Sequence, residues 1–439
     1  MNLVKIELEP VRGFRDYIPP ESDELSAIEE AFRRVAMSFG YREVRTPTVE
    51  RFELFALKSG EEIRKTMFVF KDKAGREVAL RPEVTPSVVR LYLKQLNAFP
   101  KPIKVFYIAN VFRYDEPQFG RYREFVQAGV EILGAESVYH DVELILFLEK
   151  FYDEIGLGER FYKVNDMGML KLVAMRAGLS DDEVDHVLHL LDKAMYSEAI
   201  SFLRSRGAQR EASFIEELTG MDTITKVEEF EDLRKVVEKY FEDLLPRLET
   251  FKHYFSVLKG LGIDVRIYPS FARGIAYYTG IVFEARVPNF PISIAGGGRY
   301  DDLTVVYGGQ PLKMTGFAIG VERTLLALKH LGKSVNIVYK PRVLLLVIDS
   351  MLEVIKYGVN VARKLIDAGI VVQLEIVERS RLGRMFEYAS KQQFDYVCVV
   401  GPREYETRTV SLKNMREWKQ VSVEEDRVVE EILNVVRTR

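Results

Sequence analysis

Apolar residues near the start of the chain recur with the spacing of a helix. Five of them fall on one face of a 3.6-residue period: Leu25, Ile28, Phe32, Val35 and Phe39. Gly40 follows, and glycine commonly ends a helix because it adopts a left-handed backbone at little cost. The pattern therefore predicts an amphipathic helix over residues 21–39.

Short apolar runs between turn-rich pieces predict the strands that follow. They occupy residues 66–70, 77–80, 105–114, 125–133, 264–268, 281–287 and 316–319. Residues 170–255, between these two groups of strands, are highly charged with apolar positions at helical spacing, which indicates a helical insertion. A further helix is expected near Glu322. Residues 1–330 are thus expected to form an α+β domain with an antiparallel sheet, interrupted by helices of about residues 170–255.

A polar linker at residues 331–342 precedes a change of pattern. Strands and helices then alternate, with strands expected at 343–348, 371–376, 396–400 and 409–412 and helices at 352–368, near 382–392 and from about 424. Strands that are apolar throughout are typical of sheets covered by helices on both faces. Residues 343–439 are expected to form a separate α/β domain with a mainly parallel sheet.

The composition excludes several classes of protein. The chain contains 63 Lys and Arg against 66 Asp and Glu, and its formal charge of −3 excludes a basic, tail-type nucleic-acid binder. One cysteine, Cys398, excludes an internal disulfide and a cysteine zinc site, and the five histidines form no HExxH pattern. We expect a metal ion only with the substrate. No apolar run is long enough for a membrane span or a signal peptide, so a cytoplasmic protein with no membrane partner is expected.

The most informative local pattern is the stretch of residues 111–131. Read with the period of a strand, one face carries an aromatic ring, an amide, a glycine and a carboxylate: Phe125, Gln127, Gly129 and Glu131. This face is either the solvated side of a sheet or a floor on which a ligand lies flat. Arg113, Arg121 and Arg123 surround the adjacent turn, and three guanidiniums can chelate a polyphosphate, which favours the second interpretation.

Two further segments combine glycines with arginines and tyrosines. Residues 271–280 read FARGIAYYTG and residues 295–302 read AGGGRYDD, and such loops let the backbone approach a ligand closely, although most glycine-rich loops merely turn the chain. Arg323 falls in the first turn of the helix near Glu322, where surface arginines are common. No GxxxxGK[ST] or GxGxxG pattern occurs, which excludes a P-loop and gives no support to a Rossmann site.

These segments together resemble the histidyl-tRNA synthetase family of class II aminoacyl-tRNA synthetases. GYREVRTP at residues 40–47, with Glu50, is similar to class motif 1, residues 113–131 to motif 2 and residues 316–323 to motif 3. The peptides ARGIAYYTG and AGGGRYDDL resemble the two signatures of the family, and LRPEVTP at residues 80–86 resembles its substrate loop. Residues 343–439 are similar to its anticodon-binding domain.

The resemblance implies ATP-dependent activation of histidine, followed by transfer to histidine tRNA. It implies that Arg113 holds the α-phosphate, that Phe125 stacks on adenine, and that Arg121 and Arg323 clamp the far phosphates of ATP, which brings Mg²⁺ with it. Arg273 would stabilise charge at the reacting centre, so that Arg113 and Arg273 are the implied catalytic residues. Fixed charge of this kind can act as a metal ion does.

The resemblance also implies a set of histidine-binding residues. Glu83, Thr85 and Gln127 would receive the α-ammonium, Glu131 and Tyr278 would address the imidazole, and Tyr277 and Arg273 complete the set. A buried carboxylate discriminates by roughly 10⁴ against side chains that would leave it unpaired. A homodimer through motif 1, near Pro47, is implied as well.

Two departures from the family pattern stand beside these motifs. Ile275 and Ala276 replace a Leu-Asp pair of the first signature, and Asp115 and Glu116 replace a Glu-Arg pair of motif 2. Two other functions are weighed: a regulatory paralogue that binds histidine without aminoacylating, and a synthetase for another amino acid. The four arginines Arg113, Arg121, Arg273 and Arg323 and the C-terminal domain disfavour the first, and Glu131 with Tyr278 disfavours the second.

The C-terminal domain has a local group of basic residues. Arg379, Arg381 and Arg384 come before and within one helix, and Arg403, Arg408, Lys413 and Arg416 follow later. Such a group could contact phosphates of tRNA because affinity follows nearby charge more than net charge. A solvated face is the alternative, since basic and acidic residues nearly balance in this domain. Cys398, within an apolar strand, is expected in the core.

Overall fold

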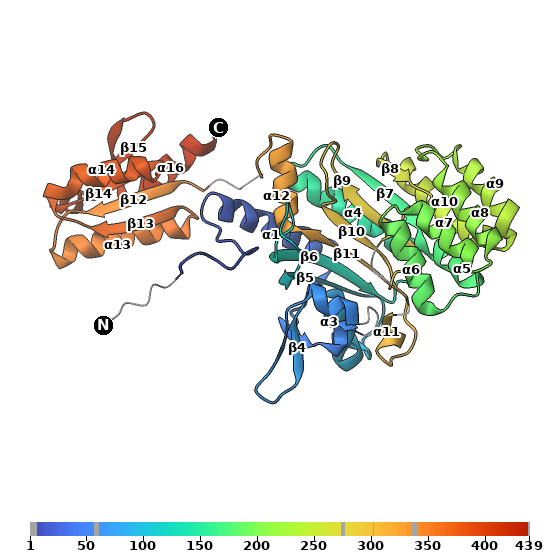
Figure 1. Ribbon diagram of the computed structural model, residues 1–439. Coiled ribbons are helices and arrows are strands. Elements are labelled where there is room, and N and C mark those ends of the chain that lie inside the picture. The colour runs from blue at the N-terminus through green and yellow to red at the C-terminus, as the bar shows by residue number, and fades with distance from the viewer. Residues whose placement is uncertain (1–6, 57–60, 274–276, 302, 336–339, 438–439) are drawn as a thin grey trace. The chain divides into compact units, whose positions relative to one another are not determined.

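The structure, a computed structural model, divides into two compact units, residues 1–337 and residues 338–439 (Figure 1). It describes residues 7–56, 61–273, 277–301, 303–335 and 340–437. Each unit is built on its own sheet. Among the described residues, no helix is both long enough and apolar enough to cross a membrane.

The first unit contains an eight-stranded sheet, whose inner strands are antiparallel and whose outer pairs β1–β5 and β7–β8 are parallel. In spatial order the strands are β1 (Arg42–Glu43), β5 (Ile103–Phe112), β6 (Glu124–Leu133), β11 (Met314–Gly320), β10 (Ala295–Arg299), β9 (Ile281–Arg286), β7 (Phe161–Asp166) and β8 (Val265–Ile267). A small second sheet has the order β2 (Val49–Arg51), β4 (Glu77–Leu80) and β3 (Val69–Lys71). The expected α+β fold on a largely antiparallel sheet is confirmed.

Strand β10 corrects one expectation, because the glycine-rich AGGGR segment is a strand and not a loop. It pairs with β9 and β11, and Gly297 stands opposite Phe283 and Phe317. A Cβ on Gly297 would collide with the backbone of Gly316 and with Phe317, so only glycine lets the three strands lie this close. This strand was not predicted because the segment lacks the β-branched residues that are typical of the other strands.

Three helices cover one face of this sheet: α1 (Glu21–Ser38), α4 (Tyr139–Glu154) and α12 (Val321–His330). The ring centroids of Phe32 of α1 and Phe147 of α4 lie 6.2 and 5.3 Å from that of Phe317 of β11, and 5.1 Å from each other. Each buried phenylalanine stabilises the fold by about 1.5–3 kcal/mol. The helix predicted from the apolar period near the N-terminus is α1, and the covered face leaves the opposite face of the sheet for a ligand.

The remaining helical segments that the structure describes in the first unit are five short ones between strands and a helical block between β7 and β8. The short ones are α2 (Glu53–Ala56), η1 (Glu61–Thr66), α3 (Thr85–Leu91), η2 (Tyr92–Leu96) and α11 (Leu303–Val306). The block comprises α5 (Met167–Arg176), α6 (Asp181–Asp192), α7 (Tyr196–Ser205), α8 (Gln209–Thr219), α9 (Phe230–Phe241), η3 (Glu242–Leu244) and α10 (Leu245–Gly260). Arg247 of α10 bonds Asp166 at 2.6 Å and the carbonyl of Thr279 at 2.9 Å, which ties this block to the sheet.

The second unit is a five-stranded sheet with helices on both faces. Its strands in spatial order are β13 (Val371–Ile376), β12 (Arg342–Val347), β14 (Tyr396–Val400), β15 (Thr409–Asn414) and β16 (Gln420–Glu424). Its helices are α13 (Leu352–Asp367), η4 (Arg379–Arg381), α14 (Leu382–Lys391), α15 (Pro402–Thr407), η5 (Glu425–Arg427) and α16 (Val428–Arg437).

The sheet of the second unit is mixed, where a mainly parallel one was expected. The first three strands in spatial order are parallel, but β15 and β16 form an antiparallel hairpin, because a turn as short as residues 415–419 can only reverse the chain. Cys398 lies in the core, as expected, and burial raises the pKa of its thiol to about 12.

Candidate active site

Strand β6 presents polar groups on the face of the sheet that the helices leave uncovered. Val130 and its apolar neighbours Ala128 and Ile132 pack into the core, whereas Gln127 and Glu131 lie on the opposite face of the strand together with Phe125. The buried side-chain oxygen of Gln127 has no hydrogen-bond partner among the residues that the structure describes. A buried amide oxygen without a hydrogen bond destabilises the fold, so this atom is suited to accept a hydrogen bond from a ligand.

Glu131 is the most enclosed acidic group on this face, with only 1% of its surface exposed. Its carboxyl group accepts hydrogen bonds from Thr85 at 2.7 Å, from Tyr107 at 3.4 Å and from Tyr300. Burial raises its pKa to about 8, and the nearby charge of Glu83 adds to the shift. Room for this carboxyl group comes from Gly316, the cross-strand neighbour of Glu131, where any Cβ would collide with it.

Glu83 is a second carboxyl group close enough to Glu131 for its charge to affect the Glu131 pKa. Tyr277 donates a hydrogen bond to it at 2.8 Å, and the Tyr277 ring packs against those of Tyr278 and Tyr300 at 5.4 and 5.7 Å. Burial raises the pKa of Glu83, against the opposing effects of Tyr277 and Arg113. The loop before α3 thus brings Glu83 and Thr85 to the face of β6, as the resemblance implies.

Arginines gather at the other end of this face. Arg113 donates to the carbonyl of Pro82 at 3.0 Å, and its guanidinium lies 5.4 Å from the centre of the Phe125 ring. Arg323, from the first turn of α12, donates to the carbonyl of Gly120 at 2.9 Å. A small cavity is lined by both these arginines and by Asp115, Gly120, Arg121, Tyr122, Phe125 and Glu322. The hairpin and the helix start, far apart in sequence, therefore form one site.

Three arginines line this cavity beside two acids, Asp115 and Glu322, and none of the three forms an ion pair with the residues that the structure describes. Burial lowers the pKa of Arg323 to about 10, and repulsion from Arg113, Arg121 and Arg273 contributes to the shift. Glu322, although it lines the cavity, accepts the backbone amide of Val126 at 3.0 Å and no arginine, and burial raises its pKa to about 7. A cluster of guanidiniums that repel one another favours the binding of a polyanion, because the anion offsets the repulsion.

The Arg273 side chain is held in position by two neighbouring strands, β9 and β10. Its guanidinium donates to Glu284 of β9 at 3.1 Å and to the carbonyl of Phe283 at 3.3 Å. Gly296 of β10 stands directly opposite Glu284, and a Cβ on this glycine would collide with the guanidinium. Sequence reasoning missed Glu284, because its position on β9, opposite a glycine of the adjacent strand β10, becomes visible only when the pairing of the two strands is known.

The structure corrects the expectation for one residue, Arg123, and adds two residues to the site. Arg123 does not face the cavity, since it donates to the carbonyl of Asp115 at 3.2 Å and lies 4.1 Å from the Tyr114 ring centre. Tyr107 and Tyr300, the two tyrosines on Glu131, were missed. The glycine at position 129 was the sequence signal that could have indicated Tyr107. Gly129 is the cross-strand partner of Tyr107, and its lack of a side chain leaves room for the tyrosine hydroxyl group.

The two departures from the family pattern have different outcomes. Ile275 and Ala276 lie outside the described residues. Asp115 lines the arginine cavity, whereas Glu116 is exposed and bonds Arg12 at 2.9 Å. Of the two carboxylates, Asp115 is therefore the one that faces the arginine cavity.

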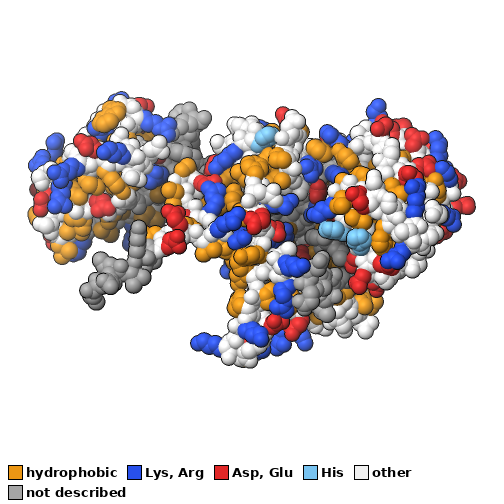
Figure 2. Space-filling model, in the orientation of Figure 1, with side chains coloured by type: hydrophobic (Ala, Val, Ile, Leu, Met, Phe, Trp, Pro, Cys, Tyr) orange, Lys and Arg blue, Asp and Glu red, His pale blue; other side chains and the backbone are white. Residues whose placement is uncertain are grey.

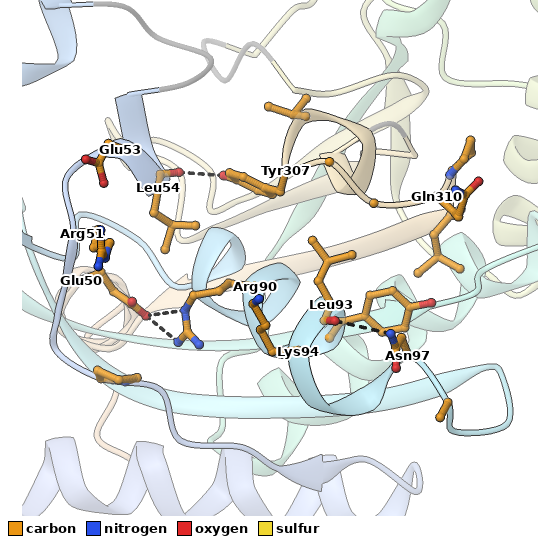
Figure 3. A pocket seen from close by; sticks show the side chains of 18 of the residues that line it. Glu50, Arg51, Glu53, Leu54, Arg90, Leu93, Lys94, Asn97, Tyr307 and Gln310 are labelled. Atoms are coloured by element: carbon orange, nitrogen blue, oxygen red, sulfur yellow. Dashed lines mark hydrogen bonds and ion pairs between the residues drawn. The ribbon is translucent and has the colours of Figure 1, made fainter.

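A much larger groove, of about 1440 Å³, opens elsewhere on the first unit (Figure 3). Pro47 lines it, Arg90 bonds Glu50 at 2.7 Å across its floor, and Tyr307 donates to the carbonyl of Leu54 at 2.8 Å. None of the arginines of the active-site cavity lines this groove. Size alone therefore does not identify the reactive site of this chain.

Comparison with known proteins identifies the family. A family model described as histidyl-tRNA synthetase matches residues 13–324, and one described as an anticodon binding domain matches residues 342–435. The chain belongs to the histidyl-tRNA synthetase family. It is 38% identical to a histidine–tRNA ligase of Sulfolobus acidocaldarius, over 98% of this chain and 99% of that protein. A histidine–tRNA ligase of Sulfurisphaera tokodaii is 40% identical over 98% of this chain and all of its own length.

Solved structures of the family agree with the fold. A histidyl-tRNA synthetase from Nostoc superposes with a TM-score of 0.79 at 21% identity, covering 98% of this chain and all of that one. The apo histidyl-tRNA synthetase of S. aureus superposes with a TM-score of 0.70 at 26% identity, covering 97% of this chain and all of that one. The predicted membership of the class II synthetases is therefore confirmed.

Proposed function

We propose that the chain activates histidine with ATP and transfers it to histidine tRNA. One observation carries this proposal: a buried acid, Glu131, which accepts hydrogen bonds from three hydroxyl groups, lies on the same strand as Phe125, which lines a cavity with three arginines. The acid selects a side chain with a ring N–H, and the arginines bind a nucleotide triphosphate. A single extended face thus accommodates both substrates of the first reaction.

The nucleotide is assigned to the arginine end of the face. Phe125 offers a flat ring to adenine, and Arg113, beside that ring, is placed to hold the α-phosphate. Arg121 and Arg323 line the same cavity and are assigned to the β- and γ-phosphates. Binding of the triphosphate relieves the mutual repulsion that lowers the pKa of Arg323, so the site is more stable when the nucleotide is bound.

Histidine is assigned to the acidic end. Glu83 and the unpaired oxygen of Gln127 are suited to accept N–H groups of the α-ammonium, and Thr85 borders both this position and Glu131. Glu131 accepts one imidazole N–H, while the Tyr278 hydroxyl addresses the other ring nitrogen, with Tyr277 fixed beside it. An apolar side chain of similar size would leave the buried acid unpaired, which costs about 1–3 kcal/mol or more.

Arg273 acts where the two substrates meet. The substrate carboxylate attacks the α-phosphorus, the bond to the β-phosphate oxygen breaks, and pyrophosphate leaves with the electron pair. Arg113 and Arg273 stabilise the charge that grows on the α-phosphate oxygens, and Glu284 holds Arg273 in position. In the second step the terminal ribose hydroxyl of the tRNA attacks the histidyl carbonyl, and AMP leaves.

Mg²⁺ is expected to enter as part of the ATP complex, where it neutralises phosphate charge. Both oxygens of Glu284 already bond arginines, Arg273 and Arg286, each at 3.1 Å. Within the described part of the chain, no group of three or more His, Cys, Asp or Glu side chains could hold a metal ion. The phosphates would therefore supply most of its ligands.

The remaining partners follow from the family and from the surface. The second unit would bind the anticodon region of the tRNA, and the enzyme would work in the cytoplasm. We expect a homodimer through motif 1, where Pro47 and its neighbours border the open groove of Figure 3. Sedimentation that shows only monomer at micromolar concentration would contradict the dimer.

Pyrophosphate exchange into ATP with each of the twenty amino acids tests the activity. Exchange should require histidine and should be lost in Arg273→Ala. Exchange with another amino acid would indicate a different synthetase. Binding of histidine without any exchange would indicate the regulatory function.

A further inference from the structure

Trp418 stands out on the surface of the second unit. It is the only tryptophan of the chain, it lies in the turn between β15 and β16, and 61% of it is exposed. Its backbone has a φ of 56°, a left-handed conformation that is uncommon for so bulky a residue. A large apolar ring that is exposed and held in an unfavourable backbone conformation points to a functional use of the ring, such as binding.

The turn that carries this ring is well defined. The side-chain oxygen of Asn414 accepts the amides of Arg416 and Glu417 at 3.0 and 3.2 Å. The backbone amide of Asn414 bonds the carbonyl of Lys419 at 2.9 Å, which closes the hairpin. Trp418 is therefore held on a fixed support, and little conformational freedom is lost when a ligand stacks on it.

Lys413 lies between two aromatic rings. Its ammonium nitrogen is 4.3 Å from the centre of the Trp418 ring and 4.6 Å from that of the Phe386 ring on α14. Lys413 and Lys419 form no ion pair with any residue that the structure describes, and Arg416 pairs with Asp395 at 3.4 Å. Glu417 is the one acidic residue within the turn. The hairpin end thus combines an open ring with excess positive charge.

Single-stranded RNA has the chemistry that this surface complements. Unpaired bases stack on exposed aromatic side chains, and neighbouring cations hold the phosphates between them. We propose that Trp418 is a stacking platform for an unpaired base of the tRNA anticodon loop, with Lys413 and Lys419 on the adjacent phosphates. This assignment rests on the proposed function and gives the second unit a specific contact residue.

The fluorescence of Trp418 tests the contact directly, since no other tryptophan contributes. The full chain is titrated with histidine tRNA, with its isolated anticodon stem-loop and with its acceptor minihelix. Stacking quenches the indole, so the tRNA and the anticodon stem-loop should quench it and the minihelix should not. Absence of quenching at saturating tRNA, or equal quenching by both fragments, would overturn the assignment.

Variants separate stacking from simple exposure. Trp418→Leu should weaken filter binding of tRNA by about 5- to 100-fold, and Trp418→Phe should retain most of the affinity because it keeps a ring. Ile366→Ala, at an exposed apolar position on α13, the helix of the opposite sheet face, is the matched control and should bind like the parent. Equal affinities for Trp418→Leu and the control would also overturn the assignment.

Two further measurements complete the design. Lys413→Gln should reduce the slope of log affinity against log salt by about 0.7, the amount for one single-strand phosphate. Histidine-dependent pyrophosphate exchange needs no tRNA and should be unchanged in every variant. If the parent chain shows no exchange with histidine, the proposed function fails, whereas exchange without any effect of Trp418 on tRNA binding overturns only this inference.

Discussion

Two arginines of the first unit and two of the second lie in opposite environments. In the first unit, Arg273 and Arg323 are largely buried, and the charges of neighbouring guanidiniums help to lower the pKa of Arg323. In the second, Arg381 and Arg384 are exposed and make no ion pair with the residues that the structure describes. Figure 2 shows basic and acidic side chains side by side over the visible face of this second unit.

The difference separates two uses of the same residue type. A buried guanidinium has a fixed position and little water around it, so it can stabilise charge that develops at one atom. An exposed guanidinium adds to affinity for a phosphate backbone without needing a precise position. Substitutions in the first unit should therefore change rate constants, and those in the second should change only tRNA affinity.

The largest effect is expected for Arg273→Ala. Loss of one preorganised group on the reacting centre should lower kcat of histidine-dependent exchange by about 10²- to 10³-fold. Arg381→Ala is the matched control from the second unit and should leave exchange unchanged. If both variants lowered kcat equally, the contrast between the two environments would be wrong.

At pH 8.5, where the Glu131 carboxylate is abundant, Glu131→Gln should raise KM for histidine by about 10- to 100-fold, because a hydrogen bond to a charged group is lost. The parent enzyme should also show a pH dependence. Its Glu131 has a pKa of about 8, so the carboxylate that accepts the ring N–H becomes abundant only as pH rises from 7 to 8.5, and KM should fall over that range.

The glutamine variant is the control for this pH dependence and should show a flat KM between pH 7 and 8.5. A KM of the parent that rises instead would mean that Glu131 keeps its proton and donates it to the ring. Steady-state exchange at saturating ATP measures both enzymes.

An effect smaller than that of Arg273→Ala is expected for Glu284→Gln, which weakens the support of Arg273 without removing the guanidinium. Misplacement of a catalytic group should lower kcat by about 10- to 100-fold with KM for histidine nearly unchanged. Arg286→Gln, on the outer side of the same carboxylate, is the matched control. A change in KM for histidine alone would show that Glu284 shapes the amino-acid pocket instead.

The smallest effect is expected for Arg381→Ala in tRNA binding. One exposed phosphate contact should change the salt dependence of affinity by a slope of about 1 and the affinity itself by a few-fold. Filter binding at three salt concentrations measures both quantities. A loss as large as that expected for Trp418→Leu would place the main contact on η4 and α14.

Periodicity predicted much of the architecture, and it failed at particular residues. The apolar spacing of Leu25 to Phe39 predicted α1, and alternation in β6 predicted which face of the strand carries Gln127 and Glu131. Strand β10 escaped because Gly296, Gly297 and Gly298 carry no side chain from which a strand period could be read. Their role is to admit neighbouring strands and the Arg273 guanidinium, which depends on tertiary pairing.

The site shows the same limit. Motifs predicted that Arg113, Arg323 and Glu131 belong together. The structure brings Arg113 and Arg323 into one cavity and places Glu131 on the same strand as Phe125, which lines that cavity. The supporting groups Tyr107, Tyr300 and Glu284 were missed, because each acts through a neighbour on another strand. Arg123 was misjudged for the converse reason, since proximity in sequence to Arg121 does not fix the direction of its side chain.

The most direct test is a crystal structure of the chain with a non-hydrolysable histidyl-adenylate analogue. We expect the imidazole to bond Glu131, the adenine to stack on Phe125, and Arg113 with Arg273 to contact the phosphate mimic. An analogue bound elsewhere, such as in the groove beside Tyr307, with Glu131 still bonded only to its tyrosines and Thr85, would contradict the account.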